Sequence, residues 1–261
     1  MKLPKAKKDL GQHFLINQEV IDDITSDFIE QASSILEIGP GPGILTEFIN
    51  KRNTKDLEYT VIEKDLRFKD YLKDYVKEEN IIFGDALKFD LSTINLKGTW
   101  LVSNLPYNIS APLTIKFLKE VNIKYMTLMY QKEVGEKISP RQTKKNTMSS
   151  LFALCQNYFE CSKLCDVAPS SFSPPPKVDS VVVSFTRREE PIIPLSEFLA
   201  FEKFLRIFFS LRRKQLKKVL KPHIPEEKLM NILTSLGKTG MERAETFQLE
   251  EVQLFYKKMR E

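Results

Sequence analysis

The chain has 261 residues, of which 42% are hydrophobic and 29% are charged. This composition fills one large domain, or one with a small satellite, and excludes collagen, low-complexity disorder and a disulfide scaffold. The longest apolar run is five residues, Leu151 to Cys155, and no apolar stretch follows the basic start. We therefore expect neither a transmembrane segment nor a membrane partner, and predict a cytoplasmic protein.

The first two thirds of the chain alternate between short apolar runs and helix-length segments. After a basic leader, residues 20–29 have the pattern of an amphipathic helix. Five strands are then predicted at 35–38, 59–63, 81–83, 100–103 and 125–130, with helices at 44–51, 66–76 and 113–120. Such alternation predicts an α/β fold with a mostly parallel sheet covered by helices on both faces.

Two further strands are predicted at 163–167 and 178–185. Only the proline-rich loop 169–176 joins them, without a helix, so we expect an antiparallel pair at one edge of a seven-stranded sheet.

From about Pro191 the pattern becomes purely helical, with helices predicted at 197–209, 211–220, 226–236 and 249–259. We therefore divide the chain into an α/β domain, residues 1–190, and a small helical domain, residues 191–261. Residues 1–17 form a basic leader to the first domain.

The charge distribution carries more information than the net charge of +5. Seven basic residues and no acidic residue lie between Leu205 and Lys221. If 211–220 is a helix, Arg213, Lys217 and Lys221 repeat every four residues on one face and repel one another. A polyanionic partner would offset this repulsion; the alternative is a solvated helix face.

The cysteines and histidines give no metal-binding pattern. Three cysteines are an odd number, and His13 and His223 lie far from them in sequence. A zinc site would need four ligands at paired short spacings. We therefore expect no metal and reduced cysteine thiols.

A glycine-rich turn, Gly39-Pro40-Gly41-Pro42-Gly43, follows the first predicted strand of the sheet. In open parallel sheets, ligands bind beyond the carboxyl ends of the strands. Phosphate sites use converging backbone N–H groups, and two of these five residues are prolines, which have none. The turn therefore favours a nucleoside cofactor without phosphate, such as S-adenosylmethionine; the alternative is a tight turn with no ligand.

Two acidic residues follow the next strands. Glu63 lies 24 residues after Gly39, where a carboxylate can accept hydrogen bonds from both hydroxyls of a ribose. Asp85 follows the third strand and can accept a hydrogen bond from an adenine amino group. The alternatives are a solvated acid for Glu63 and an ordinary turn residue for Asp85.

The segment Asn104-Leu105-Pro106-Tyr107-Asn108-Ile109-Ser110 is the most specific signal. The exocyclic amine of adenine is a poor nucleophile because its lone pair is conjugated with the ring. The amide oxygen of Asn104 and the carbonyl of Leu105 can each accept one of its N–H groups, while Pro106 stiffens the turn. The ring of Tyr107 offers a stacking surface for a base.

With these motifs the sequence resembles the bacterial small-subunit ribosomal RNA adenine dimethyltransferases, the KsgA family. The match adds the opening motif Gly11-Gln12-His13-Phe14-Leu15, the loop Pro169–Phe172 followed by Pro174–Ser180, and the helical-domain markers Arg212-Arg213-Lys214 and Arg243-Ala244-Glu245. It departs from the family at 146–151, which puts any RNA contact there in doubt.

The resemblance implies a Rossmann-like class I methyltransferase domain that binds S-adenosylmethionine, with a helical RNA-binding domain. It also implies that the leader, residues 1–17, closes over the cofactor. It implies that four methyl groups go to two adjacent adenosines near the 3′ end of 16S rRNA in the small ribosomal subunit, with a role in subunit maturation. Catalytic roles fall to Asn104, Leu105, Pro106, Tyr107 and a base-stacking Phe172. Cofactor contacts fall to Gln12, His13, Leu15, Gly39, Gly41, Glu63, Asp85 and Asn104, and RNA contacts to Arg212, Arg213, Lys214, Lys217 and Lys221.

Two other functions stay open. One is a 23S rRNA adenine dimethyltransferase that confers antibiotic resistance, in which Asn-Ile-Pro-Tyr is usual where this chain has Asn-Leu-Pro-Tyr. The other is a non-catalytic rRNA-binding assembly factor on the same fold; Glu63, Asp85 and residues 104–107 argue against it. We expect a monomer.

Overall fold

The computed structural model describes residues 3–7, 11–139, 148–211 and 213–261. The chain folds into two compact units. Unit 1 comprises residues 1–139 and 160–187, and unit 2 comprises residues 140–159 and 188–261. The boundary after residue 187 lies close to the one expected at 190. Residues 140–159 also belong to unit 2, which the sequence pattern did not indicate.

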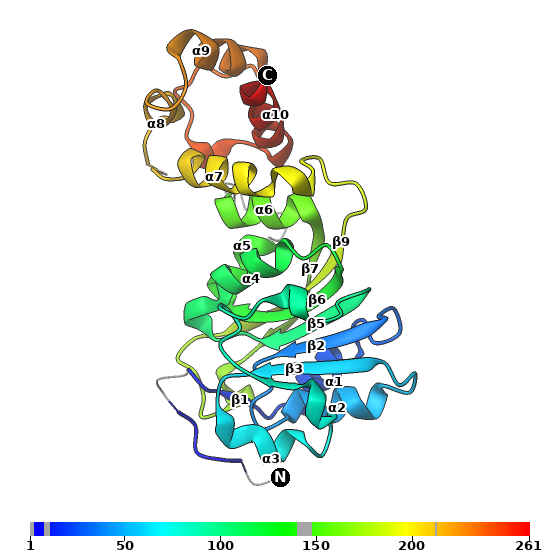
Figure 1. Cartoon of the computed structure of the whole chain (residues 1–261). Helices are drawn as coiled ribbons and strands as arrows, with labels where there is room; N and C mark the ends of the chain where they lie inside the picture. Colours follow the sequence, from blue (N-terminus) through cyan, green and yellow to red (C-terminus); the bar gives the residue numbers. More distant parts are fainter. Residues whose placement is uncertain (1–2, 8–10, 140–147, 212) are drawn as a thin grey trace. The chain divides into compact units, whose positions relative to one another are not determined.

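Unit 1 is built on a seven-stranded sheet in the order β4-β3-β2-β5-β6-β9-β7 (Figure 1). The pairs from β4 to β6 are parallel, and β9 is antiparallel to β6. All seven predicted strands are present, with shifted ends: β2 (Ser34–Ile38), β3 (Glu58–Glu63), β4 (Ile81–Phe83), β5 (Thr99–Asn104), β6 (Ile123–Gln131), β7 (Phe159–Val167) and β9 (Ser180–Arg187).

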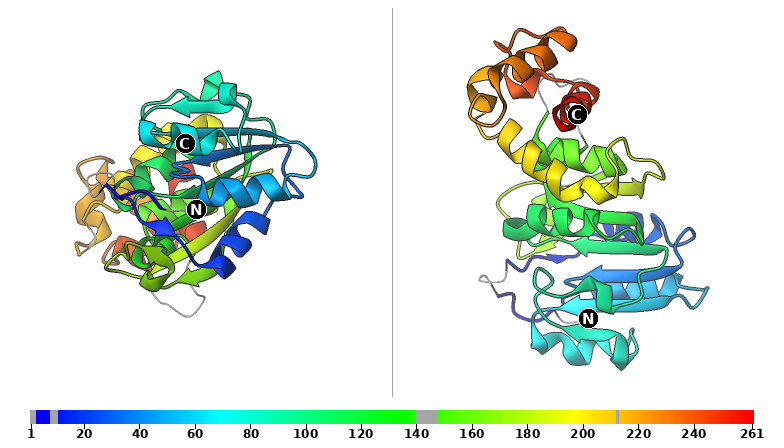
Figure 2. Two further views of the ribbon diagram at one scale, coloured as in Figure 1. Left: turned by 90° about the horizontal axis from the view of Figure 1, so that it is seen from below. Right: turned by 45° about the horizontal axis from the view of Figure 1, so that its top comes forward.

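Helices cover both faces of this sheet (Figure 2). Alternate residues of a strand point to opposite faces. Val182 belongs to the core cluster that α1 and α2 share with β2 and β3, whereas Val181 and Val183 face Gly135 of α5. A Cβ on Gly135 would lie 2.2 Å from the side chain of Val181, so glycine permits this close approach. The helices of unit 1 are α1 (Gln18–Ser26), α2 (Ile44–Arg52), α3 (Lys69–Leu72), α4 (Ser110–Leu118) and α5 (Lys132–Ile138).

A two-stranded antiparallel sheet ties the leader to the proline-rich loop. It pairs β1 (Phe14–Leu15) with β8 (Phe172–Ser173), so that Leu15 lies opposite Phe172. The residues involved are 157 positions apart, and neither two-residue strand was predicted. The pairing places the opening motif beside the loop that follows β7.

The helix expected at 66–76 is wrong in its length, because the regular helix is much shorter. A 3-10 turn, η2 (Leu66–Phe68), precedes the four-residue α3. The Asp65 side chain accepts a hydrogen bond from the backbone N–H of Arg67 and begins the turn, and the N–H of Tyr75 bonds back only three residues to Leu72. These tight turns shorten the regular helix.

Unit 2 is helical, with a core of aromatic rings. Phe204 lies 5.2 Å from Phe208 and 5.8 Å from Phe255, measured between ring centroids. Buried Asn157 bonds to the backbone of Ile193 in both directions, at 2.9 and 3.1 Å, and accepts from the Gln253 side chain. These bonds explain why α6 belongs to unit 2. Its helices are α6 (Ser150–Tyr158), α7 (Phe198–Phe208), α8 (Leu216–Leu220), α9 (Glu226–Ser235) and α10 (Leu249–Arg260).

The helix expected at 211–220 is also wrong, because only the second half, α8, is helical. The backbone N–H groups of Leu216 and Lys217 donate to the carbonyls of Glu242 and Gly240, not to carbonyls four residues earlier. The contact with 240–242 therefore replaces the first helical turn, and Arg213 does not share a helical face with Lys217 and Lys221.

Among the described residues, no helix is both long and apolar enough to cross a membrane. Those residues also contain no group of three or more His, Cys, Asp or Glu side chains placed to hold a metal ion. The three cysteines are free, and burial raises the pKa of the Cys155 thiol.

Candidate active site

A cavity of about 210 Å³ opens in unit 1 where four neighbouring parallel strands end. The turns after β2, β3, β4 and β5 contribute its walls, and residues 11–15 of the leader close one side. Leu105, Pro106 and Tyr107 line this cavity. So do all eight residues that the sequence assigned to the cofactor: Gln12, His13, Leu15, Gly39, Gly41, Glu63, Asp85 and Asn104.

The three backbone N–H groups of the glycine-rich turn 39–43 are all hydrogen-bonded to other groups of the protein. The N–H of Gly39 bonds to the carbonyl of Ile62, that of Gly41 to the Glu63 carboxylate, and that of Gly43 to the carbonyl of Pro40. The other two residues are prolines, so no N–H of this turn remains to bind a phosphate. Gly39 has a φ of +69°, and a Cβ there would meet no atom within 4 Å, so its open side faces space that a ligand can fill.

Glu63 closes β3 as a buried carboxylate, 6% exposed. One oxygen accepts from the N–H of Gly41 at 2.9 Å, and the other from the N–H of Asp65 at 2.7 Å. Burial raises the pKa of Glu63, and these backbone hydrogen bonds oppose the rise. Each oxygen keeps further acceptor capacity, so the carboxylate is fixed in position and can still accept from a hydroxyl.

Asp85 lies in the turn after β4. It pairs with Lys64 at 2.9 Å and accepts from the N–H of Leu87 at 3.0 Å; the hydrogen bond from Lys64 is the main reason that its pKa is lowered. The same turn is held by Lys116 of α4, whose ammonium donates to the carbonyls of Ala86, Leu87 and Phe89.

Asn104 ends β5 at the cavity. Its side-chain nitrogen donates to the main-chain carbonyl of His13 at 3.2 Å. This bond fixes the rotation of the amide and leaves the amide oxygen as the group that can accept from a ligand.

Tyr107 begins a 3-10 turn, η5 (Tyr107–Ile109), directly before α4. Its hydroxyl bonds to the hydroxyl of Ser180 at 2.7 Å, and burial raises its pKa. The ring stacks loosely on His13, with centroids 6.1 Å apart and planes at 22°. The His13 ring is held in turn by a 2.8 Å hydrogen bond to the carbonyl of Pro174.

Phe172 does not take the position that the sequence suggested. It is 3% exposed, belongs to the hydrophobic core cluster and does not line the cavity. Burial of the ring and the pairing of β8 with β1 hold it there. In this structure the aromatic ring beside Tyr107 is therefore His13, not Phe172.

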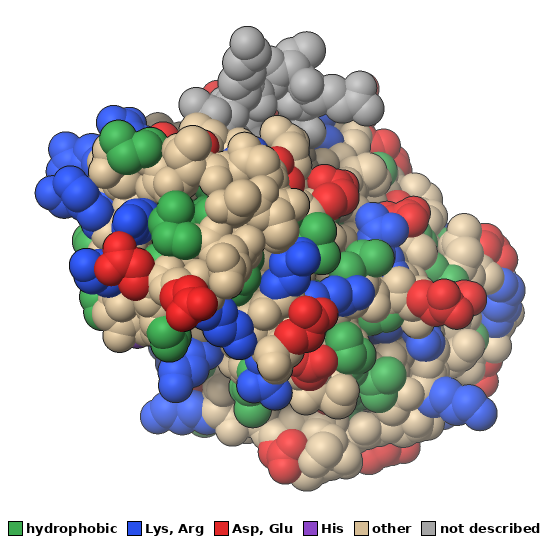
Figure 3. Space-filling model, turned by 90° about the horizontal axis from the view of Figure 1, so that it is seen from above, with side chains coloured by type: hydrophobic (Ala, Val, Ile, Leu, Met, Phe, Trp, Pro, Cys, Tyr) green, Lys and Arg blue, Asp and Glu red, His purple; other side chains and the backbone are tan. Residues whose placement is uncertain are grey.

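The basic residues proposed to contact RNA are in unit 2. Arg212 lies outside the described residues, and Arg213 and Lys214 are exposed. Lys217 and Lys221 both form ion pairs with Glu226, at 3.0 and 3.2 Å. Glu226 thus relieves the repulsion that had suggested an anionic partner, and Figure 3 shows acidic side chains interspersed among basic ones.

The sequence reading missed one residue that lines the cavity, Glu37, and one that stands behind its wall, Asp65. Glu37 is 1% exposed and lines the cavity, bonded to Thr46 at 2.8 Å and to the Tyr59 hydroxyl. Asp65 stands behind the wall and anchors the leader. An acid inside an apolar strand was the available signal for Glu37. The leader partners of Asp65, Lys7 and Gln12, lie more than 50 residues away and gave no signal.

A model of the family described as "Ribosomal RNA adenine dimethylase" matches residues 3–259. The chain belongs to this family. A curated relative from Clostridium botulinum, "Ribosomal RNA small subunit methyltransferase A", is 36% identical over 255 residues, covering 95% of this chain and 91% of the relative. One of the same name from Pelagibacter ubique is 40% identical over 219 residues, covering 82% of each chain.

Two solved structures extend the family match to the fold. A dimethyladenosine transferase from Plasmodium falciparum has a TM-score of 0.72 at 28% identity, covering 93% of this chain and 96% of that one. The 23S rRNA methyltransferase ErmE has a TM-score of 0.71 at 22% identity, covering 95% of this chain and all of that one, and supports the fold alone. The predicted Rossmann-like class I methyltransferase fold is confirmed.

Proposed function

We propose that the protein transfers methyl groups from S-adenosylmethionine to N6 of two adjacent adenosines in the 3′-terminal hairpin of 16S rRNA, dimethylating each by in-line displacement. The observation that carries the proposal is the hydrogen bond from the Asn104 amide nitrogen to the carbonyl of His13. This bond occupies the amide nitrogen, so the group that the Asn104 side chain offers to a ligand of the cavity is a neutral amide oxygen and not a charged base.

The cavity residues fit S-adenosylmethionine. Its sulfonium carries the methyl group that is transferred. The turn 39–43 keeps no N–H for a phosphate, which this cofactor lacks. Glu63 and Asp85 both line the cavity, where Glu63 would accept from ribose hydroxyls and Asp85 from the adenine amine. No metal is required in this scheme.

The target amine is oriented by two oxygens of the chain. The Asn104 amide oxygen and the Leu105 carbonyl would each accept one N–H, drawing the nitrogen towards tetrahedral geometry. A fixed acceptor pair costs no reorganisation during the reaction. For the second methylation only one N–H remains, so one acceptor is then unused. The methylated ammonium becomes acidic, so its proton can pass to water.

The base must leave its RNA stack to reach this site. We propose that it stacks on Tyr107, whose hydroxyl bond to Ser180 fixes the ring. His13 then lines the base site from the leader, and Phe172 would join only after leaving its buried position.

We assign methyl transfer to unit 1 and RNA contacts to unit 2, with Arg213 and Lys214 as exposed candidates beside Arg212. Arginine and lysine bind RNA phosphates with release of counterions. The proposed substrate is rRNA within the nascent small subunit, which places the protein in the cytoplasm, as a monomer with a role in subunit maturation.

Methylation of 23S rRNA is the competing activity. The curated relatives at 34–40% identity are named for the small subunit, which favours 16S rRNA. A non-catalytic assembly factor would not need an anchored Asn104 or a fixed Glu63.

The test is mass spectrometry of rRNA nucleosides after incubation of isolated, unmethylated 30S and 50S subunits with the protein. We expect N6,N6-dimethyladenosine in 16S rRNA with the wild-type chain and little with Asn104→Ala. Dimethyladenosine only in 23S rRNA would support the resistance enzyme. No methylation of either RNA by a protein that binds the small subunit would support the assembly factor.

A further inference from the structure

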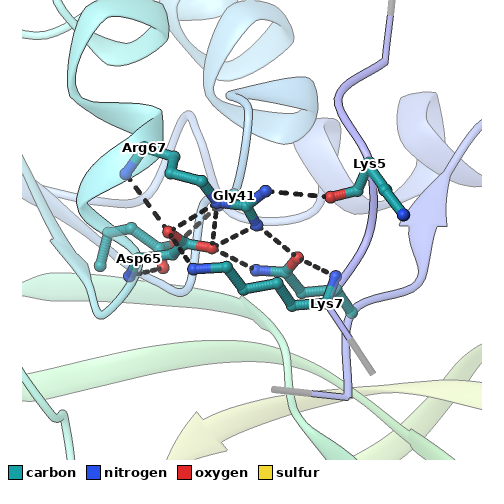
Figure 4. Close-up of polar contacts among 7 residues, drawn as sticks. Lys5, Lys7, Gly41, Asp65 and Arg67 are labelled. Atoms are coloured by element: carbon teal, nitrogen blue, oxygen red, sulfur yellow. Dashed lines mark hydrogen bonds and ion pairs between the residues drawn. The ribbon is translucent and has the colours of Figure 1, made fainter. Parts of the chain in front are cut away.

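Asp65, in the turn between β3 and η2, is a buried acid whose carboxylate accepts hydrogen bonds from three side chains. Its side chain is 2% exposed. It accepts from Arg67 at 2.6 Å, from Gln12 at 3.1 Å and from Lys7 at 3.3 Å (Figure 4). The hydrogen bond from Arg67 is the main reason that the pKa of Asp65 lies far below its usual range. The residue is therefore a permanent anion, and two of its three partners come from the leader.

Arg67 extends the same anchor to the leader backbone. Its guanidinium donates to the carbonyl of Lys5 at 3.2 Å and to the side-chain oxygen of Gln12 at 3.4 Å. That Gln12 oxygen also accepts from the backbone N–H of Lys7 at 2.8 Å. Three leader residues, Lys5, Lys7 and Gln12, are thus fastened to Asp65 and Arg67 of one turn, and Gln12 also lines the cavity.

The side chain of Asp65 bonds to the leader, whereas its backbone bonds to the cavity wall. Its N–H donates to Glu63 at 2.7 Å, and Glu63 is a wall of the cavity. A shift of Asp65 would therefore move both the leader and the carboxylate placed for the ribose.

We propose that Asp65 is a positioning residue that couples the position of the leader beside the cavity to recognition of the ribose of S-adenosylmethionine. The inference deepens the proposed function and rests on its assignment of the cofactor. Because coupling between two binding events is reciprocal, an anchored leader tightens cofactor binding and bound cofactor holds the leader. Removing a hydrogen bond to a charged group in such an anchor costs about tenfold in binding.

The test compares Asp65→Asn with Asp70→Asn in the full-length protein. Asparagine is isosteric and can still begin η2, but it is neutral; Asp70 is exposed on α3 and loses the same charge. Two quantities are measured: the Kd of S-adenosylmethionine by calorimetry, and the rate of tryptic cleavage after Lys5 and Lys7 by intact mass, with and without saturating cofactor.

We expect Asp65→Asn to weaken cofactor binding about tenfold, to speed cleavage by a similar factor and to raise KM for the cofactor more than it lowers kcat. Bound cofactor should slow cleavage in the wild type and less so in the variant. Asp70→Asn should match the wild type. Gln12→Ala removes one donor and leaves Asp65 in place. In the double variant with Gln12→Ala and Asp65→Asn, Kd should rise by less than the product of the two single-variant factors.

Three results overturn the inference while the wild type binds the cofactor: unchanged cleavage in Asp65→Asn, faster cleavage with unchanged Kd, or a double variant whose effects multiply. A wild-type chain that binds no S-adenosylmethionine would instead contradict the proposed function, and the coupling with it. A Tm for Asp65→Asn close to that of Asp70→Asn excludes general unfolding as the cause.

Discussion

The side-chain nitrogen of Asn104 and the main-chain carbonyl of His13 are joined by a 3.2 Å hydrogen bond. The two residues are 91 positions apart, on β5 and on the leader. Because the bond uses the donor of the amide, it selects which end of the Asn104 side chain a substrate amine meets. The leader is thus part of the candidate active site, since it holds Asn104 and also lines the cavity.

The first prediction concerns Asn104→Asp. Aspartate has the same shape but no donor for the His13 carbonyl, and its negative charge would face that carbonyl oxygen, so the side chain loses the hydrogen bond that fixes its orientation. We expect single-turnover methyl transfer to fall by about 10²–10³ at saturating S-adenosylmethionine. Asn122→Asp, at an exposed position before β6, is the matched control. A rate within about twofold of wild type would remove Asn104 from catalysis.

The sequence predicts the sheet and the cavity well because both depend on local signals. Buried parallel strands are apolar runs, and the cavity forms where such strands end, so Glu63, Asp85 and Asn104 could be brought together from their positions alone. Glycine and proline in the turn 39–43 likewise exclude phosphate donors without reference to the rest of the fold.

The errors arise where contacts distant in sequence decide. Phe172 is buried because β8 pairs with β1, and the helix at 211–220 is halved because 216 and 217 bond to 242 and 240. The apparent repulsion among the lysines of α8 is relieved by Glu226 on the next helix. The periodicity of a single segment contains none of these partners.

The second prediction concerns the pH dependence of stability. Burial raises the pKa of Glu37 to about 7, although Tyr59 and Thr46 donate hydrogen bonds to it. In the unfolded chain its pKa is near the model-peptide value of about 4.3. Between these values the folded state holds a proton that the unfolded state has lost, so the free energy of unfolding falls as pH rises, by about 4 kcal/mol in all.

Glu37→Gln removes this contribution, since glutamine does not titrate. Urea unfolding of both proteins from pH 4.5 to pH 8 measures it, and the contributions of the other acids cancel in the difference. We expect the wild type to lose stability relative to the variant across this range. Parallel curves would show that Glu37 titrates normally.

The third prediction concerns Glu226, which pairs with Lys217 and Lys221. Exposed ion pairs are weak, so Glu226→Gln should release both lysines at little cost in stability. If this surface binds rRNA, affinity should rise about two- to fivefold, and the slope of log K against log salt should steepen by about 0.7–0.9 for each lysine that gains a phosphate.

Glu227→Gln, an exposed neighbour on the same helix, should leave the RNA affinity less affected. Filter binding at several salt concentrations measures both variants. Equal slopes for Glu226→Gln and Glu227→Gln would place the RNA away from Lys217 and Lys221.

The fourth prediction concerns Lys116, the ammonium that holds the carbonyls of Ala86, Leu87 and Phe89. Desolvation of this partly buried group lowers its pKa, yet the nearby carboxylates favour the charged form, in the order Glu120, Asp90 and Asp85. Lys116→Met keeps the length of the side chain and removes its donors. We expect faster hydrogen exchange in 85–89, weaker binding of S-adenosylmethionine and a stability loss of about 2 kcal/mol.

Lys88→Met is the control, because Lys88 lies in the same turn and is exposed. Its exchange rates and cofactor Kd should match the wild type, so that an effect confined to Lys116→Met reports the carbonyl contacts and not the loss of a positive charge. If Lys116→Met lowers Tm but leaves the Kd unchanged, Asp85 keeps its position without this support, and the ion pair with Lys64 must suffice to hold it.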